Sequence, residues 1–329
     1  MQLPGSERGA PTLERAVSGL MLVDGNGLAW RIATGVADTG FETAVLYRAT
    51  QALLEYRAGF PSWTILLVFD GGRSRVREAL YPAYKAHREA TPDRQRVIRG
   101  LQVWQAALDD LGRPYLRVEG VEADDLISIL AADARARGIR AVVVSDDSDL
   151  YQCLGGTVSQ YVPRKRQHMT AHEALAEWKG SPGWYLLWKA LVGDPTDNIP
   201  GVTGIGEKRA HELTALAAGR SGWLFEQQAR TVLADRKWAK ILWTKEGADQ
   251  FRLAYRLVRT AVTYRELDPD GSGPLASTTE AEVRRVLERF RTPISLTRET
   301  WTDFVRRYDV FPLLGDTVLL ERLFAFTIQ

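Results

Sequence analysis

The chain is poor in the side chains that form cross-links or bind zinc. Its 329 residues include four histidines and a single cysteine, Cys153. One cysteine excludes a disulfide framework within the chain, which fits a reducing compartment. Because the sequence has no cluster of histidine and cysteine, a zinc site is also disfavoured.

Long apolar runs are missing as well. No stretch of about 18 apolar residues occurs, so no membrane span is expected. Residues 1–18 lack the apolar segment of a signal peptide, and we expect them to form a flexible N-terminal extension.

The net charge is small, at +2, but the charges are unevenly distributed. Residues 73–99 carry eight basic and three acidic side chains, whereas other acidic residues gather beside predicted strand ends. Separate basic and acidic zones suit a protein that binds a polyanion and also needs a metal. A mixed, solvated surface is the alternative.

Apolar runs of strand length alternate with helical patterns in residues 19–170. The patterns predict strands at 19–27, 63–72, 113–120 and 140–149, and helices at 42–59, 96–112 and 122–138. This alternation favours an α/β fold with a central, mainly parallel sheet and helices on both faces. From residue 171 to 329 the pattern is mostly helical, so we expect a helical region after the α/β core.

Carboxylates follow the predicted strand ends or open the next helix. They are Asp24, Asp70, Glu122, Asp124, Asp125, Asp147, Asp149, Asp194 and Asp197. Sites in parallel sheets form at the carboxyl ends of the strands, so these acids should converge. Uncompensated carboxylates raise one another's pKa values, and divalent cations remove that cost. Oxygen donors favour Mg²⁺ or Mn²⁺, and the number of acids suggests two ions. For any single acid, a helix cap is the alternative.

The stretch YPAYKAHREATPDRQR, residues 81–96, is a candidate phosphate-binding segment. Lys85 and Arg88 are three apart and would share a helix face. Their charge could bind a phosphate and offset charge that develops during its reaction. Pro92 is expected to break the helix, which suggests a short helix within a mobile loop. A solvated basic helix is the alternative.

The stretch GVTGIGEKRAHEL is a glycine-rich turn that opens a helix. Backbone N–H groups near Gly201, Gly204 and Gly206 could approach a phosphate, with Lys208 and Arg209 close behind. A helix–hairpin–helix of this kind grips a duplex backbone without reading its sequence. The alternative is a plain pair of packed helices.

Five motifs, taken together, resemble the 5′-nuclease family, which includes bacteriophage flap endonucleases and the 5′→3′ exonuclease domain of bacterial DNA polymerase I. They are LVDGNGLAWR, VFDGGRSRVREALYPAYKAHR, GVEADDLISIL, VSDDSDLYQ and ALVGDPTDNIPGVTGIGEKRA, in that order. The resemblance runs from about residue 20 to residue 213. It implies a PIN-like fold with a helical arch at about 73–99 and a helix–hairpin–helix at about 194–216.

The resemblance also implies a reaction and its partners. The reaction is hydrolysis of DNA phosphodiesters near free 5′ ends, nicks or 5′ flaps, with two Mg²⁺ ions or Mn²⁺ in their place. RNA-containing 5′ strands are further candidate substrates, and K⁺ is a candidate ion at the helix–hairpin–helix. We expect a monomer without membrane contact, in the cytoplasm of a bacterium or a phage-infected cell. No polymerase segment follows, so a free-standing nuclease is expected.

By resemblance, each site residue has an expected role. The first metal cluster would comprise Asp24, Asp70, Glu122, Asp124 and Asp125, and the second Asp147, Asp149, Asp194 and Asp197. Lys85 and Arg88 match a catalytic basic pair, Arg31 and Arg77 match phosphate-contacting arginines, and Tyr84 is a candidate for stacking on a base. Asp146 is an extra acid, expected to be a spectator. The alternatives are an inactive DNA-binding module and an RNase H-like remover of RNA primers.

Overall fold

A computed structural model of the chain describes residues 19–33, 41–88, 91–178, 182–216, 235–268, 273–290 and 297–310. The expected N-terminal extension, residues 1–18, lies outside these ranges. Within them, no helix is long and apolar enough to cross a membrane.

A six-stranded sheet in the order β3-β2-β1-β4-β5-β6 forms the centre of the molecule. The strands are β1 (Leu20–Asp24), β2 (Thr64–Phe69), β3 (Leu116–Arg117), β4 (Ala141–Val144), β5 (Val158–Val162) and β6 (Gln167–Met169). Neighbours pair in parallel from β3 to β5, and β6 pairs antiparallel with β5. The predicted mainly parallel sheet is therefore confirmed, although β3 is much shorter than the run from which it was predicted.

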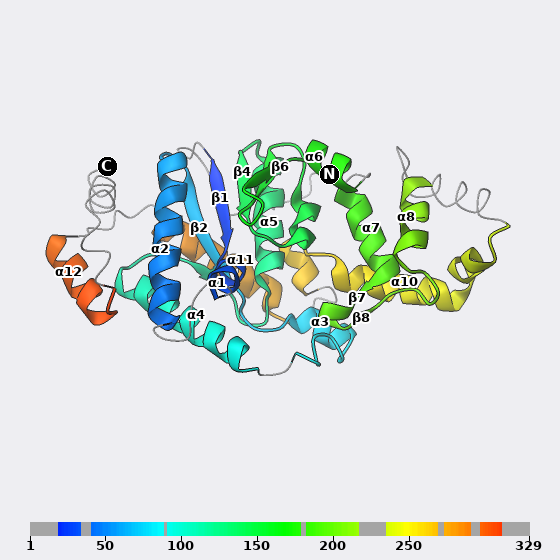
Figure 1. Ribbon diagram of the computed structural model, residues 1–329, viewed down its shortest axis with the longest axis horizontal. Coiled ribbons are helices and arrows are strands. Elements are labelled where there is room, and N and C mark those ends of the chain that lie inside the picture. The colour runs from blue at the N-terminus through cyan, green and yellow to red at the C-terminus, as the bar shows by residue number, and fades with distance from the viewer. Residues whose placement is uncertain are drawn as a thin grey trace, which may run out of the picture.

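Helices cover both faces of this sheet (Figure 1). On one face, Met21 and Val23 of β1 belong to a core cluster with residues of α1 (Gly25–Ala33), α2 (Phe41–Gly59) and α4 (Pro92–Asp110). On the other, Leu20 and Leu22 belong to a cluster with α5 (Ala123–Ala136). Because both faces are buried, the strands read as continuous apolar runs.

The basic stretch that follows β2 differs from its sequence prediction. A short helix, α3 (Arg75–Leu80), is followed by turns from residue 81 to 88. Lys85 has a positive φ of 54°, so it does not share a helix face with Arg88. Pro92 does not break a helix either. It stands in the first turn of α4 behind the N-cap Thr91, where its missing N–H costs nothing.

The described residues after position 170 are mostly helical, as predicted. They form α6 (Ala171–Trp178), α7 (Pro182–Val192), α8 (Glu207–Leu216), α10 (Lys245–Val258), α11 (Leu275–Arg289) and α12 (Arg298–Arg307). A small antiparallel pair, β7 (Gly193–Asp194) and β8 (Ile199–Pro200), lies between α7 and α8. Two late helices return to the core, since α11 joins the cluster around α5 and α12 joins the one around α2.

The hairpin between α7 and α8 depends on close approach of the backbone. A Cβ atom on Gly201 would lie 2.2 Å from the carbonyl oxygen of Val192, so glycine is required there. Val202 and Ile205 are buried in a cluster with Leu191 and Leu213, which packs α7 against α8. This helix, hairpin and helix arrangement is the one that the glycine-rich stretch predicted.

Candidate active site

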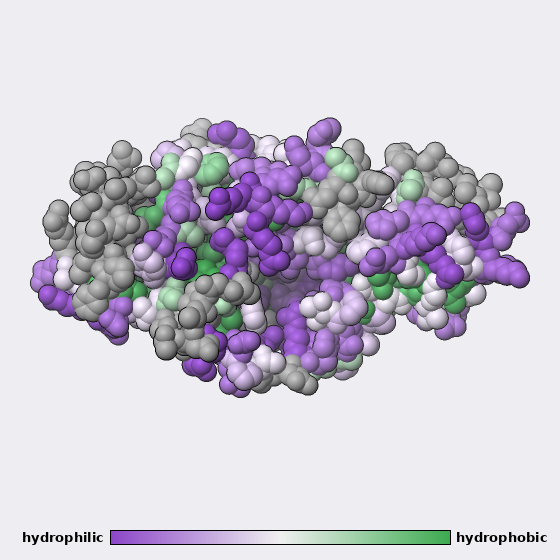
Figure 2. All heavy atoms as spheres, in the orientation of Figure 1, coloured by the Kyte–Doolittle hydropathy of each residue, from purple (hydrophilic) through white to green (hydrophobic). Residues whose placement is uncertain are grey.

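A pocket with a volume of about 710 Å³ opens where the parallel strands end. Eight of the nine predicted acids line it, the exception being Asp125. They come from the ends of β1, β2 and β4, the start of α5, the 3₁₀ turn η1 (Ser148–Cys153) and the β7 region. Figure 2 shows a hydrophilic hollow near the middle of this face of the molecule. The convergence expected from the sequence is therefore present in the structure.

Local hydrogen bonds hold Asp24 and Asp70 at this edge of the sheet. β1 runs directly into α1, and the Asp24 carboxylate accepts hydrogen bonds from the Gly27 N–H and the Ser145 hydroxyl, both at 2.8 Å. Asp70, at the end of β2, accepts a 2.8 Å hydrogen bond from the N–H of Ala123 in the first turn of α5. These bonds join the end of β1 to α1 and to the residue after β4, and the end of β2 to the start of α5.

Four of the pocket acids have no ion pair with any described residue. They are Asp24, Asp70, Asp124 and Asp147. Burial raises the pKa of Asp24 to about 7, and nearby Asp70 adds to the rise. Burial and the charge of Asp149 raise the pKa of Asp147 to about 6. The pKa of Asp124 is raised by burial and by Asp147. We call these four residues the unpaired acids.

The remaining pocket acids are paired with basic side chains. Lys85 lies between two of them, with Nζ 2.7 Å from Glu122 Oε1 and 3.4 Å from Asp197 Oδ2. Arg88 also contacts Asp197. Burial opposes the charge of Lys85, but Glu122 and Asp197 outweigh it and raise its pKa. The two basic side chains predicted to be catalytic, Lys85 and Arg88, therefore lie in the pocket, where they form ion pairs with its acids.

A second lysine, which the sequence analysis did not single out, bridges the other side of the pocket. Lys189 of α7 contacts Asp149, and its Nζ lies 2.9 Å from Asp194 Oδ2. The Tyr185 hydroxyl donates to Asp149 at 2.9 Å. Although burial opposes ionisation of Asp194, the charge of Lys189 lowers its pKa. The available signal was a lone lysine in the apolar stretch GWYLLWKALVG, five residues before Asp194.

Asp125 and Arg77 differ from their sequence predictions. Arg77 Nη1 and Nη2 donate to the two carboxylate oxygens of Asp125 at 2.6 and 2.9 Å, and both side chains are buried. Arg77 also donates to the carbonyl of Leu257, in the last turn of α10 (Lys245–Val258), and to that of Arg259 just after it. The pair therefore anchors α3 and α5 to the 257–261 segment. The structure therefore places both Asp125 and Arg77 outside the acidic pocket, in a buried ion pair.

Tyr84 is likewise not placed to stack on a base. It is only 2% exposed, and its hydroxyl donates to Glu122 at 2.8 Å. Trp30, one of the described residues that line the pocket, is 40% exposed. Glu122 thus accepts from Tyr84, Lys85 and Arg77, so its carboxylate is held by three donors.

The outer basic residues lie in two places. Arg31 is paired with Asp146 at 3.7 Å, so the extra acid in the VSDDSD motif has a cationic partner. At the helix–hairpin–helix, Arg209 folds back onto the Gly204 carbonyl and the Trp238 ring. Lys208, beside it, is exposed. Gly204 and Gly206 are exposed at the same turn.

The carboxylates of the pocket are the kind of ligand that a hard divalent cation prefers, but they are not arranged as a formed coordination site. The unpaired acids are carboxylates whose mutual repulsion a cation would relieve. Nevertheless, among the described residues no three acidic, histidine or cysteine side chains come together as a formed metal site. Basic side chains already contact the other acids of the pocket.

Comparison with known proteins agrees with this architecture. The sequence model of the 5′-3′ exonuclease N-terminal resolvase-like domain matches residues 19–179. DNA polymerase I of Mycobacterium bovis is 37% identical over 216 residues, which are 63% of this chain and 24% of that protein. DNA polymerase I of Pseudomonas aeruginosa is 32% identical over 255 residues, or 76% of this chain and 28% of that protein. The chain thus matches about a quarter of the length of these relatives.

Solved structures show the same fold. A bacteriophage T5 flap endonuclease in a complex with DNA and metal ions superposes with a TM-score of 0.64 at 20% identity, covering 83% of this chain and 100% of that one. A zinc-bound T5 5′-exonuclease gives a TM-score of 0.61 at 18% identity, covering 82% and 99%. Residues 19–179 thus match the family of 5′-3′ exonuclease N-terminal resolvase-like domains, and the solved structures share the fold of this chain.

Proposed function

We propose that this protein is a structure-specific 5′ nuclease, which hydrolyses DNA phosphodiesters near free 5′ ends or 5′ flaps during replication or repair. The observation that carries the proposal is the pocket at the strand ends, where four unpaired acids face a basic edge formed by Lys85 and Arg88. An acidic pocket alone would repel a phosphate. The basic edge gives the phosphate a binding surface beside the acids.

Two divalent cations, Mg²⁺ or Mn²⁺, are the proposed cofactors. The unpaired acids would hold one ion, and Asp149, Asp194 and Asp197 would contribute to the second. When bound, such ions supply Lewis-acid chemistry, which activates the attacking water and stabilises the leaving oxygen. The raised pKa values of Asp24 and Asp147 support this assignment, because like charges without a counter-ion favour cation binding.

Lys85 and Arg88 would bind the scissile phosphate. Both already lie within reach of Asp197, which keeps their charges inside the pocket in the absence of DNA. The N–H of Lys85 donates to the Asp197 carbonyl at 2.9 Å, which fixes the turn that carries both side chains. Their cationic groups would offset the negative charge that develops on the phosphate oxygens. Trp30, at the edge of the pocket, would stack on a base near the cleaved bond.

The helix–hairpin–helix would bind the duplex next to the cleaved strand. The exposed turn at Gly204 and Gly206 leads into α8, whose first N–H groups suit a backbone phosphate. Lys208 adds an exposed cation at the same place. Contacts of this kind do not depend on sequence, so binding should weaken steeply with salt. A K⁺ ion at this turn stays a prediction of the family resemblance.

The test uses 5′-labelled flap, nicked and blunt DNA, together with an RNA–DNA hybrid, each incubated with Mg²⁺ or with EDTA. We expect cleavage of the flap and nicked substrates with Mg²⁺ and none with EDTA. Asp147→Asn should nearly abolish cleavage and leave DNA binding intact. Asp146→Asn is the matched control, since its acid is paired with Arg31 and should be dispensable.

Three outcomes would contradict the proposal or redirect it. Wild-type turnover by Asp147→Asn would remove the metal assignment. Binding without cleavage of any substrate would favour an inactive DNA-binding module. Preference for the RNA–DNA hybrid over the flap would favour an RNase H-like enzyme.

A further inference from the structure

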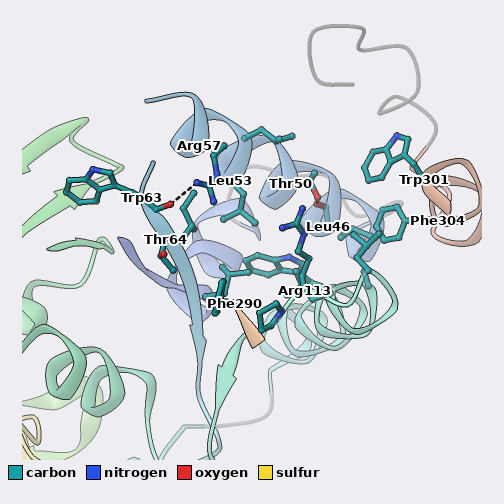
Figure 3. A pocket seen from close by; sticks show the side chains of 18 of the residues that line it. Leu46, Thr50, Leu53, Arg57, Trp63, Thr64, Arg113, Phe290, Trp301 and Phe304 are labelled. Carbon is teal, nitrogen blue, oxygen red and sulfur yellow. Dashed lines mark hydrogen bonds between the residues drawn. The ribbon is translucent and has the colours of Figure 1, made fainter. Parts of the chain in front are cut away.

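A second pocket lies at the other end of β2, away from the acids. Its volume is about 440 Å³, within the range of about 300–1,000 Å³ that is usual for small-molecule sites. It is enclosed by α2, α4, the start of β2 and α12 (Figure 3). Apolar side chains form most of its wall, among them Leu46, Leu53, Trp104, Leu108, Trp301 and Phe304.

Among the described residues that line this pocket, two are arginines and none is acidic. Arg57 is held by the protein, because its Nη1 donates to the carbonyls of Pro61 and Trp63 at 3.0 and 2.7 Å. Arg113 has neither an ion pair nor a side-chain hydrogen bond with any described residue. In Figure 3 its side chain rises into the space between α4 and α2, toward Thr50.

The unpaired guanidinium carries an energetic cost. Burial lowers the pKa of Arg113, and burial together with the charge of Arg113 lowers the pKa of Arg57. Placing a charge among apolar side chains without a partner is unfavourable, and an anion beside it would offset that cost. The described part of the pocket supplies no such anion, so a bound molecule could supply it.

We propose that this pocket binds an apolar molecule with a single carboxylate, whose carboxylate pairs with Arg113 and whose apolar part packs between α2, α4 and α12. Arg113 is suited to this role because a guanidinium can bind a carboxylate through two parallel hydrogen bonds. The apolar lining next to Trp104 and Phe304 favours a hydrocarbon or aromatic body over a sugar or a nucleotide. The inference does not rest on the nuclease function, since the pocket is separate from the acidic one.

The experiment titrates the full chain with decanoate, in EDTA and without DNA, and measures the heat of binding. We expect saturable binding at one site, and weaker binding of decan-1-ol, which has the same chain length without the charge. Arg113→Met keeps the length and apolar character of the side chain but removes its charge. It should weaken decanoate binding by about tenfold or more, the loss of about one charge-assisted contact.

The matched control is Arg252→Met, which removes an exposed arginine on α10, outside this pocket. It should bind decanoate as the wild type does. Because Arg113 makes no ion pair or side-chain hydrogen bond with a described residue, and methionine keeps the apolar packing, Arg113→Met should unfold at the wild-type temperature or above it. That measurement separates lost binding from lost folding.

Several results would overturn the inference. Absence of decanoate binding would mean that the pocket does not admit a small molecule. Equal binding of decanoate and decan-1-ol would show that no anion is recognised. Unchanged affinity in Arg113→Met would place the bound molecule elsewhere.

Discussion

Lys189 Nζ lies 2.9 Å from Asp194 Oδ2, inside the pocket that we expect to hold divalent cations. The same ammonium contacts Asp149, so Lys189 forms ion pairs with two of the acids that are proposed to hold the second ion. A metal ion that binds there must compete with this lysine or displace it. Lys189 is therefore expected to weaken metal binding while it stabilises the metal-free protein.

Replacing this lysine tests the competition directly. Lys189→Met should raise the affinity for Mn²⁺ by about tenfold, as expected when a competing contact of about 1.4 kcal/mol is removed. The metal-free variant should be less stable, because Asp149 and Asp194 lose their counter-ion. Titration calorimetry with Mn²⁺ and urea denaturation in EDTA measure the two effects. Lys189→Arg, which keeps the charge, is the control, and equal or weaker metal affinity in Lys189→Met would contradict the interpretation.

The unpaired acids predict an unusual dependence of stability on pH. Their folded-state pKa values are raised, to about 7 for Asp24 and about 6 for Asp147 from an ordinary 3.8. The folded state thus binds more protons than the unfolded state, so these groups make the metal-free protein less stable as pH rises from about 4 to 7. Saturating Mg²⁺ should remove most of this decline.

Asp124→Asn isolates the effect, because Asp124 accepts no side-chain hydrogen bond from a described residue whose loss would confuse the result. In EDTA at pH 8 the variant should be more stable than the wild type, because it removes a charge that burial and the neighbouring carboxylates disfavour; the gain is about 1.4 kcal/mol for each unit by which they raise the pKa of Asp124. At pH 4, where the wild-type carboxyl is protonated, the two should be equal. Urea denaturation at both pH values measures this, and a destabilised variant at pH 8 would rule out uncompensated repulsion.

Arg77 is predicted to be structural and not a phosphate ligand. Arg77→Met should destabilise the protein by about 3–5 kcal/mol, because the buried Asp125 carboxylate would lose its partner. Adding Asp125→Leu should recover part of the loss, since no unpaired charge would remain. Urea denaturation gives these values. Loss of DNA affinity by a variant of wild-type stability would instead restore the phosphate-binding role.

Lys85 is predicted to act mainly on the chemical step. Lys85→Ala should slow single-turnover cleavage by on the order of a hundredfold, as expected for removal of a group that stabilises developing charge. Affinity for flap DNA, measured in Ca²⁺, should fall by only a few fold. Lys208→Ala is the contrasting variant: it should weaken the binding of flap DNA, and it should slow single-turnover cleavage of bound DNA less than Lys85→Ala does. If Lys85→Ala lost cleavage rate and DNA affinity equally, Lys85 would contribute to DNA binding and not to the chemical step.

Much of the fold could be predicted from the sequence because its signals are local. β4 is apolar throughout, and β1 and β2 are apolar except for the terminal Asp24 and the initial Thr64; a turn or helix start follows each of them. Strand ends in a parallel sheet share one edge, so the order of the elements was enough to bring the acids together. The segment at 81–88 was misread as helix because spacing alone cannot show that Lys85 adopts a positive φ.

The sequence by itself determined a mainly parallel α/β core, the edge where the acids gather and the helix–hairpin–helix, since each depends on periodicity or on residues close in the chain. Only the tertiary structure decided which charges meet. Asp125 is paired with Arg77, Asp194 with Lys189, and Arg113 with no described residue. Such contacts depend on how α3, α5 and α7 pack, because the same carboxylate can bind a metal or a guanidinium according to what lies within about 4 Å of it.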